Sequence, residues 1–192
     1  MTDQEIERYK AKICLLGDPM VGKTSLIRKY VLDQFSDEYI PTIGTKVTKR
    51  ELSLYRGDVR NYVSLMIWDI NGKREMMDQT IREFRDFIPK TFMMGAEGVI
   101  FVCDITRRDS FAHLQLWYDT LVSAVGREVS CILLGNKTDL KASAEITYDE
   151  IMDMNRRYGF PFYYTSARTG ENVETAFLRM SEILMDKIFL MK

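Results

Sequence analysis

The sequence has few of the features that mark secreted, membrane-spanning or nucleic-acid-binding proteins. It contains only 3 cysteines in 192 residues, an odd number that argues against a disulfide framework. No apolar stretch reaches the roughly 20 residues that a transmembrane helix needs. The formal net charge is −1, so there is no overall basic footprint for nucleic acid or an anionic membrane. We therefore expect a reduced, cytoplasmic protein that binds no nucleic acid.

Targeting and lipidation signals are also missing from the sequence. The first residues do not resemble a signal peptide, and residue 2 is Thr2 rather than the glycine that N-myristoylation requires. Residues 189–192 contain no cysteine for prenylation. We expect no lipid anchor, and membrane association through partners if at all. The cysteines all lie in apolar runs, where we expect buried thiols: Cys14, Cys103 and Cys131.

What is present is a regular alternation of strand-like and helix-like segments. The expected strands are 10–16, 47–55, 62–68, 98–103, 129–134 and 161–164. The expected helices are 22–32, 73–92, 107–125, 147–158 and 171–190. Alternation of this kind predicts a single α/β domain over residues 1–192, with helices on both faces of a mostly parallel sheet. The turn at 56–58 predicts an antiparallel hairpin, so one of the six strands should run against the others.

The segment that organises the chain is Gly17–Thr24, which reads G-D-P-M-V-G-K-T. It lies between a strand and a helix and has the spacing of a phosphate-binding loop. In such a loop, backbone N–H groups and the helix N-terminus surround an anion. Lys23 adds a charge for the β- and γ-phosphates, and the Thr24 hydroxyl is a hard oxygen ligand for Mg²⁺. The loop alone names neither the base nor the reaction.

A second motif, Asn136-Lys137-Thr138-Asp139, favours guanine as the base. Guanine offers two neighbouring donors, N1–H and the N2 amino group, and one carboxylate accepts both. Adenine presents a lone pair there, which leaves the carboxylate unpaired. A site of this kind discriminates by roughly 10⁴ or more. Asn136 can supply amide contacts, and the stem of Lys137 can lie across the ring.

Three further residues follow strands or lie in a long loop. Asp69 can reach Mg²⁺ through water, and Gly72 can offer its N–H to a γ-phosphate. Thr42 is a candidate second Mg²⁺ ligand, although, taken alone, this residue is better explained as a solvent-facing loop threonine. Because ligands of α/β sheets bind at the carboxyl ends of strands, we expect these residues to meet the loops after Leu16 and Leu134.

Taken together, the motifs resemble the signature segments of the Ras superfamily of small GTPases, and are most similar to the Rab branch. The resemblance spans about 10–190. It rests on five segments: G-D-P-M-V-G-K-T (17–24), F-S-D-E-Y-I-P-T-I-G (35–44), W-D-I-N-G (68–72), G-N-K-T-D (135–139) and T-S-A (165–167).

The resemblance implies a fold, ligands and residue roles. The fold would be that of a P-loop GTPase, and the ligands GTP or GDP with Mg²⁺. Two switch segments, about 35–45 and 70–92, would bind effectors, exchange factors and activating proteins. Phe35 would pack edge-on to guanine, and the amides of Ser166 and Ala167 would meet its oxygen. The implied nucleotide-binding residues are Asp18, Pro19, Met20, Val21, Gly22, Lys23, Thr24, Ser25, Phe35, Tyr39, Thr42, Asp69, Gly72, Asn136, Lys137, Asp139, Ser166, Ala167 and Arg168. The implied metal ligands are Thr24, Thr42 and Asp69, and the implied catalytic residues are Lys23, Thr42, Gly72 and Lys73.

The sequence departs from the family pattern after Gly72, where Lys73 replaces the usual glutamine. Glutamine orients the attacking water, whereas lysine has donors only. We expect slow GTP hydrolysis, or alternatively a largely non-hydrolysing, GTP-bound scaffold. A kinase with a phosphate-binding loop would leave 136–139 and 165–167 without a role. The segment 73–95 is longer than usual and rich in methionine, which fits either a binding face or extra core packing. We expect the lone histidine, His113, to serve surface or packing roles on its helix.

Overall fold

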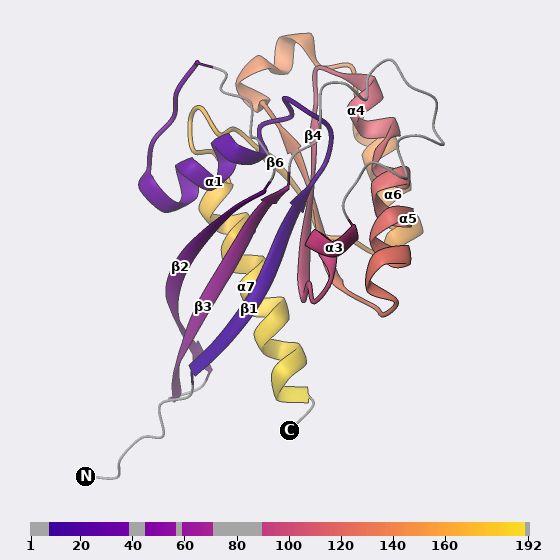
Figure 1. Ribbon diagram of the computed structural model, residues 1–192. Coiled ribbons are helices and arrows are strands. Elements are labelled where there is room, and N and C mark those ends of the chain that lie inside the picture. Colours follow the sequence, from indigo (N-terminus) through magenta and orange to yellow (C-terminus); the bar gives the residue numbers. More distant parts are fainter. Residues whose placement is uncertain (1–7, 39–44, 57–58, 71–89, 191–192) are drawn as a thin grey trace, which may run out of the picture.

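The computed structural model describes residues 8–38, 45–56, 59–70 and 90–190. Its sheet has six strands in the order β2-β3-β1-β4-β5-β6 (Figure 1). The strands are β1 Arg8–Leu16, β2 Thr45–Arg56, β3 Val59–Ile70, β4 Gly98–Asp104, β5 Ser130–Asn136 and β6 Phe162–Thr165. The helices are α1 Lys23–Leu32, α3 Lys90–Met93, α4 Arg108–Ala112, α5 Leu114–Val125, the 3-10 helix η2 Thr138–Ser143, α6 Tyr148–Tyr158 and α7 Val173–Leu190.

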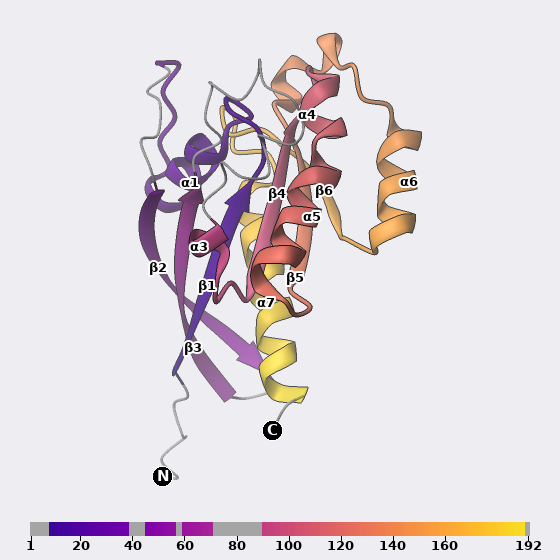
Figure 2. The same cartoon turned by 45° about the vertical axis from the view of Figure 1, so that its right-hand side comes forward.

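The predicted sheet topology is confirmed. Among the strands that the structure describes, only β2 and β3 pair antiparallel, while β1 pairs parallel with both β3 and β4, and β4–β5 and β5–β6 are also parallel. Helices cover both faces, with α1 and α7 on one side and α5 and α6 on the other (Figure 2). The parallel pairing brings the carboxyl ends of β1, β3, β4, β5 and β6 to one edge of the sheet, at the top in Figure 1.

Each face of the sheet has its own hydrophobic core because side chains alternate along a strand. In β1, Ile13 and Leu15 belong to the cluster beneath α1 and α7, and Cys14 and Leu16 to the opposite cluster. Tyr30 of α1 stacks on a phenylalanine of α7, with ring centroids 4.1 Å apart. A strand that is covered on both faces must be apolar at nearly every position, which explains the unbroken apolar run in the sequence.

The three cysteines are buried, as expected from their apolar surroundings. Burial disfavours the charged thiolate. It raises the pKa of Cys14 to about 12, despite an opposing effect of Lys12, and that of Cys131 also to about 12. The pKa of Cys103 is raised for the same reason. These thiols are therefore unreactive packing groups.

The helix boundaries differ from the prediction at two places. The expected helix 107–125 is divided at His113, where α4 ends and α5 begins. The interruption is one residue wide, since the His113 N–H still bonds Asp109 O and its carbonyl accepts from Trp117 N–H. The expected helix 73–92 lies outside the described residues up to position 89, and α3 occupies its end. No helix in the described part of the chain is long and apolar enough to cross a bilayer.

The start of α6 is fixed by a capping box, as the sequence indicates. The Thr147 hydroxyl accepts from the Glu150 N–H, and the Glu150 carboxylate accepts from the Thr147 backbone N–H at 2.8 Å. Arg108 also contacts this carboxylate. The hydrogen bonds from Thr147 in particular, and the Arg108 guanidinium in addition, lower the pKa of Glu150 to about 2.

Glu150→Gln should therefore reduce stability at neutral pH and matter little in strong acid. Because the folded pKa lies below the ordinary value of 4.5, the carboxylate stabilises the fold above pH 4.5, and this contribution is lost as the pH falls towards 2. Urea unfolding at pH 7 and pH 2.5 measures the difference between variant and wild type. The difference should shrink in acid, whereas Glu128→Gln in an exposed loop should change neither value. A difference that stays constant with pH would contradict this assignment.

Candidate nucleotide-binding site

Three loops and one strand end that the sequence singles out meet at the carboxyl edge of the sheet, at the top in Figure 1. The phosphate loop follows β1, and Asp69 is the penultimate residue of β3. The motif 136–139 begins at the last residue of β5, and 165–168 begins at the last residue of β6. Parallel pairing of Asn136 with Thr165, and of Asp104 with Asn136, fixes these ends beside one another. The site therefore follows from the sheet topology.

The phosphate loop needs glycine at its two ends. Gly17 has φ +146°, and a Cβ there would lie 2.1 Å from the backbone oxygen of Val102. Gly22 has φ +103°, and a Cβ there would lie 2.3 Å from the Asn136 amide nitrogen. Between them Met20 also has positive φ, +65°. Only glycine combines these dihedral angles with such close approaches, so the loop shape is specified by the sequence.

Lys23, the first residue of α1, is buried and points back over the loop. Its ammonium group donates to Gly17 O at 2.6 Å and to Asp18 O at 2.7 Å. Burial lowers its pKa to about 8, although the nearby carboxylates of Asp69 and Asp18 oppose this shift. Negatively charged phosphates would favour the charged ammonium further. The lysine is thus placed at the mouth of the loop, with its charge only partly compensated.

Thr24 and Asp69 bring two hard oxygen donors together beside Lys23. The Thr24 hydroxyl donates to Asp69 Oδ2 at 2.5 Å, and Asp69 is buried. Mg²⁺ prefers oxygen ligands and often binds through one or two protein groups, water and phosphates. The described residues contain no cluster of three or more His, Cys, Asp or Glu side chains that would hold a metal by themselves. The donor set fits Mg²⁺ held jointly with a polyphosphate.

Asn136 connects the base motif with the phosphate loop. Its amide nitrogen donates to Val21 O at 2.8 Å. Its carbonyl oxygen accepts from the Ala167 N–H at 3.2 Å and from the Thr165 hydroxyl at 3.3 Å. The side chain is buried and its polar atoms are all used. One amide therefore ties together the loops after β1, β5 and β6.

Asp139 lies at the exposed side of this assembly. The Ser166 hydroxyl donates to its Oδ1 at 2.5 Å, and Arg168 Nε lies 3.5 Å from its Oδ2. Arg168 also pairs with Asp37, and its guanidinium lies 5.4 Å from the centre of the Phe35 ring. An ionised carboxylate has about four acceptor sites, so Asp139 retains capacity for a further pair of donors.

Two predicted contacts of the base loop differ in detail. The Ser166 N–H donates to Glu171 O and the Ala167 N–H to Asn136 Oδ1, so both amides already have acceptors inside the protein. Lys137, in a left-handed conformation, pairs through Nζ with the buried Asp104 at 2.6 Å. This ion pair anchors the head of the lysine. Asp104 was not among the predicted site residues. Like Asp69, it is an aspartate at the carboxyl end of a strand, so the same pattern could have identified it.

The Asp18 side chain points away from the loop interior and is buried against the segment after β4. Its Oδ2 lies 2.7 Å from His113 Nδ1, and its Oδ1 accepts from Trp117 Nε1 at 3.0 Å. Arg107 Nη1 donates to Pro19 O at 2.9 Å. The sequence predicts a surface or packing role for His113, and its side chain is 45% exposed. The ring also contacts the phosphate loop through Asp18, a contact that the sequence pattern does not indicate.

The remaining predicted residues are only partly described. Val21 is buried, Met20 is exposed, and Ser25 lies in the first turn of α1. Four predicted site residues lie outside the described residues: Tyr39, Thr42, Gly72 and Lys73.

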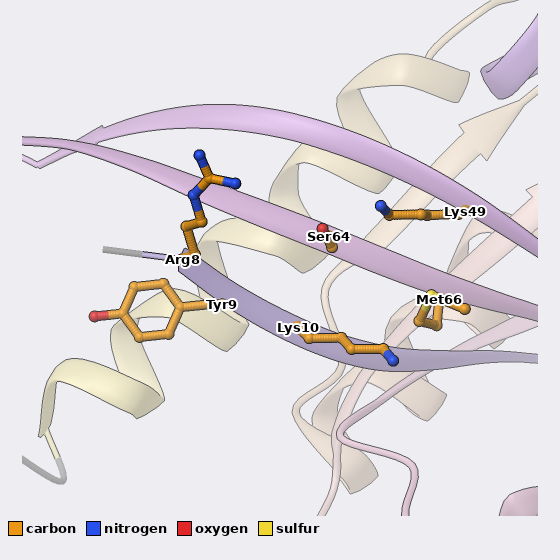
Figure 3. A pocket seen from close by; sticks show the side chains of 6 residues that line it. All are labelled: Arg8, Tyr9, Lys10, Lys49, Ser64 and Met66. Carbon is orange, nitrogen blue, oxygen red and sulfur yellow. The ribbon is translucent and has the colours of Figure 1, made fainter. Parts of the chain in front are cut away.

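A surface depression of about 340 Å³ lies elsewhere, on β1, β2 and β3 (Figure 3). It is lined by Arg8, Tyr9, Lys10, Lys49, Ser64 and Met66. Arg8 and Lys10 belong to the amino-terminal half of β1, whereas the phosphate loop follows its carboxyl end. The depression is therefore separate from the candidate nucleotide site.

Comparisons with known proteins agree with this geometry. Residues 12–186 match the family profile described as "Ras family". The chain is 32% identical over 180 residues to Ras-related protein Rab-4 of Dictyostelium discoideum, a match that covers 94% of this chain and 82% of that protein. It is 31% identical over 176 residues to Ras-related protein Rab-13 of Canis lupus familiaris, covering 92% and 80%. Members of this family are GTP-binding molecular switches. The chain thus belongs to the Ras family of small GTPases and is Rab-like.

Proposed function

We propose that this chain is a guanine-nucleotide-dependent molecular switch that binds GTP or GDP with Mg²⁺ and hydrolyses GTP slowly to GDP and phosphate. The phosphate loop and Lys23 hold the phosphates. Thr24 and Thr42 bind Mg²⁺, with Asp69 acting through water. The ion supplies charge neutralisation at the phosphates when bound. Asp139 selects guanine, and Phe35 packs against the base.

The observation that carries this proposal is the set of contacts made by Asn136. Its bonds to Val21 O, Thr165 and Ala167 join the phosphate loop to both base loops. A nucleotide binder must hold phosphates and base at a fixed separation, and a shared buried side chain provides this. The Asp139 carboxylate then lies beside Ser166 on the same assembly. If the chain were instead a kinase with a phosphate-binding loop, the contacts between Asn136 and the two base loops would have no function in nucleotide binding.

Base selection rests on Asp139 in this proposal. Its carboxylate accepts N1–H and N2–H of guanine together, as a charge-assisted pair. The Ser166 hydroxyl and Arg168 hold the carboxylate in place. The Ala167 N–H, which bonds Asn136 in this structure, would be shared with the guanine oxygen. Its neighbour Ser166 contributes through its hydroxyl rather than through its amide.

Slow hydrolysis rests on Lys73. An ammonium group cannot accept a hydrogen bond from the attacking water, although it can stabilise charge on the γ-phosphate. Lys73→Gln should raise the single-turnover rate of GTP hydrolysis by roughly 10-fold or more. Lys10→Gln, at the far end of β1, is the matched control and should leave the rate unchanged. A wild-type rate that Lys73→Gln does not increase would contradict the role given to Lys73.

The same substitution motivates a second candidate function, a GTP-bound scaffold that hardly turns over. The two candidates differ in the nucleotide that the protein retains. Chromatography of nucleotide released from freshly purified protein should show mainly GDP for a slow switch and mainly GTP for a scaffold. In either case, the segments 35–45 and 70–92 are proposed to bind effectors, exchange factors and activating proteins.

A further inference from the structure

We propose that Arg107, His113 and Trp117 form a positioning frame that holds the phosphate loop in its binding shape and thereby slows nucleotide release. The proposal rests on the proposed function, because it concerns the phosphates of a bound guanine nucleotide. The three residues come from the segment that follows β4 and includes α4 and the start of α5. None of them belongs to the motifs that identify the site.

The first part of the frame holds the Asp18 side chain. Asp18 is only 3% exposed, and Trp117 is fully buried. A buried carboxylate is costly unless donors surround it. His113 Nδ1 at 2.7 Å and Trp117 Nε1 at 3.0 Å supply them, and the charged Arg107 Nη2 lies 3.9 Å from the same carboxylate. Since a carboxylate only accepts, the ring nitrogen facing it carries the proton. The start of the loop is therefore fastened to α5.

The second part of the frame orients a backbone amide of the loop. Arg107 Nη1 donates to Pro19 O at 2.9 Å. In a trans peptide the carbonyl and the following N–H point in opposite directions. Holding Pro19 O outwards therefore turns the Met20 N–H inwards, towards the space that the loop encloses. Pro19 has no N–H of its own, which makes the Met20 N–H the first donor after Asp18.

Asn136 acts in the same way on a second carbonyl of the loop. It holds Val21 O at 2.8 Å, and so turns the Gly22 N–H inwards. Arg107 and Asn136 thus hold the carbonyls of Pro19 and Val21, the two residues that flank Met20 in the loop. The strained dihedral angle of Met20, φ +65°, lies between these two anchors. A loop with non-glycine positive φ keeps this shape only where its surroundings impose it.

Arg107 takes part in both halves of the frame, because it lies next to the Asp18 carboxylate and also holds the Pro19 carbonyl. It is therefore the most informative residue to substitute. Besides its bond to Pro19 O, its Nη2 is buried next to Asp18 and makes no hydrogen bond within the described residues. The next residue, Arg108, provides a matched control. It contacts Glu145 and Glu150 at the start of α6, and therefore tests the loss of an arginine that does not touch the loop.

The experiment measures dissociation of a fluorescent GDP analogue from the full chain with Mg²⁺ present. Arg107→Ala should speed release by roughly 10-fold to 100-fold, the range expected for one hydrogen bond to a charged group. Arg108→Ala should stay within about twofold of wild type. His113→Ala should also speed release, and His113→Asn, which keeps a donor, should restore part of the loss. Trp117→Phe removes the N–H and keeps an aromatic ring, but the smaller ring also leaves space at this fully buried position. It is a second variant that tests the frame without changing Arg107.

A second measurement separates positioning from general destabilisation. Guanosine has no phosphate, so its binding by ligand-observed NMR should be the same for wild type and Arg107→Ala. Equal weakening of guanosine and GDP, or GDP release within twofold of wild type in both Arg107→Ala and Trp117→Phe, would overturn the frame. Wild-type protein that binds no GDP would instead reject the proposed function.

Discussion

Replacing Asp139 by alanine should weaken GDP binding by about 10³-fold to 10⁴-fold and abolish the preference for guanine over adenine. The carboxylate is the group that the proposal assigns to N1–H and N2–H of guanine. Without it, both donors lose a charge-assisted acceptor inside a partly closed site, and sites built around such contacts discriminate by 10⁴ or more. Calorimetry with GDP and ADP, in the presence of Mg²⁺, measures both affinities for each protein.

The fold itself should tolerate Asp139→Ala. The carboxylate bonds the Ser166 hydroxyl and lies near Arg168, which keeps its contact with Asp37. The thermal midpoint without nucleotide should therefore change little. Asp186→Ala, which removes an exposed carboxylate from α7, is the control for loss of one negative charge and should leave GDP affinity unaltered. Unchanged GDP affinity in Asp139→Ala would show that the base is recognised elsewhere.

Gly17→Ala should be the most destabilising single substitution in the phosphate loop, costing more than about 4 kcal/mol of unfolding free energy. Its Cβ would lie 2.1 Å from Val102 O, a backbone atom of β4 that cannot move without disturbing the sheet. The dihedral angle φ of +146° adds strain for any L side chain. Urea unfolding of the nucleotide-free protein measures the decrease in unfolding free energy. A Gly17→Ala protein that does not fold at all would also agree with the prediction.

Gly126→Ala is the control for a positive φ without a steric clash. Gly126 follows α5 with φ +67°, and no other atom of the described residues lies within 4 Å of a Cβ built there. We expect a loss of about 1 kcal/mol, from the left-handed conformation without a clash. The difference between the two losses therefore reports the close approach of the loop to β4 together with the additional strain of φ +146° at Gly17. Equal losses at both positions would mean that the loop can shift away from Val102 at little cost.

The convergence of the motifs could be predicted from the sequence because it depends on local periodicity and one topological rule. Apolar runs located the strands to within a few residues. In a parallel sheet the carboxyl ends of the strands lie at the same edge, so Asp69 and Asn136 were expected at one edge of the sheet. The need for glycine at positions 17 and 22 could be predicted, because only glycine allows these dihedral angles where the backbone closely approaches other atoms. The capping box at the start of α6 could also be predicted from the sequence, because Thr147 and Glu150 lie within one helical turn.

The contacts that depend on distant residues could not be predicted. His113 and Trp117 lie 95 and 99 residues from Asp18, and nothing in the pattern of α5 indicates that a histidine faces the phosphate loop. The break between α4 and α5 at His113 could not be predicted either, because the helical spacing of apolar residues continues through it. The ion pair of Lys137 with Asp104 and the internal use of the Ser166 and Ala167 amides also arise only when the strand ends meet.

The central claim is that this edge of the sheet binds a guanine nucleotide. Its most direct test is calorimetric titration of nucleotide-free wild-type protein with GDP and with ADP, both with Mg²⁺. The account predicts that GDP binds roughly 10⁴-fold or more tightly than ADP. Equal affinities for the two nucleotides, or no detectable binding of GDP, would contradict it.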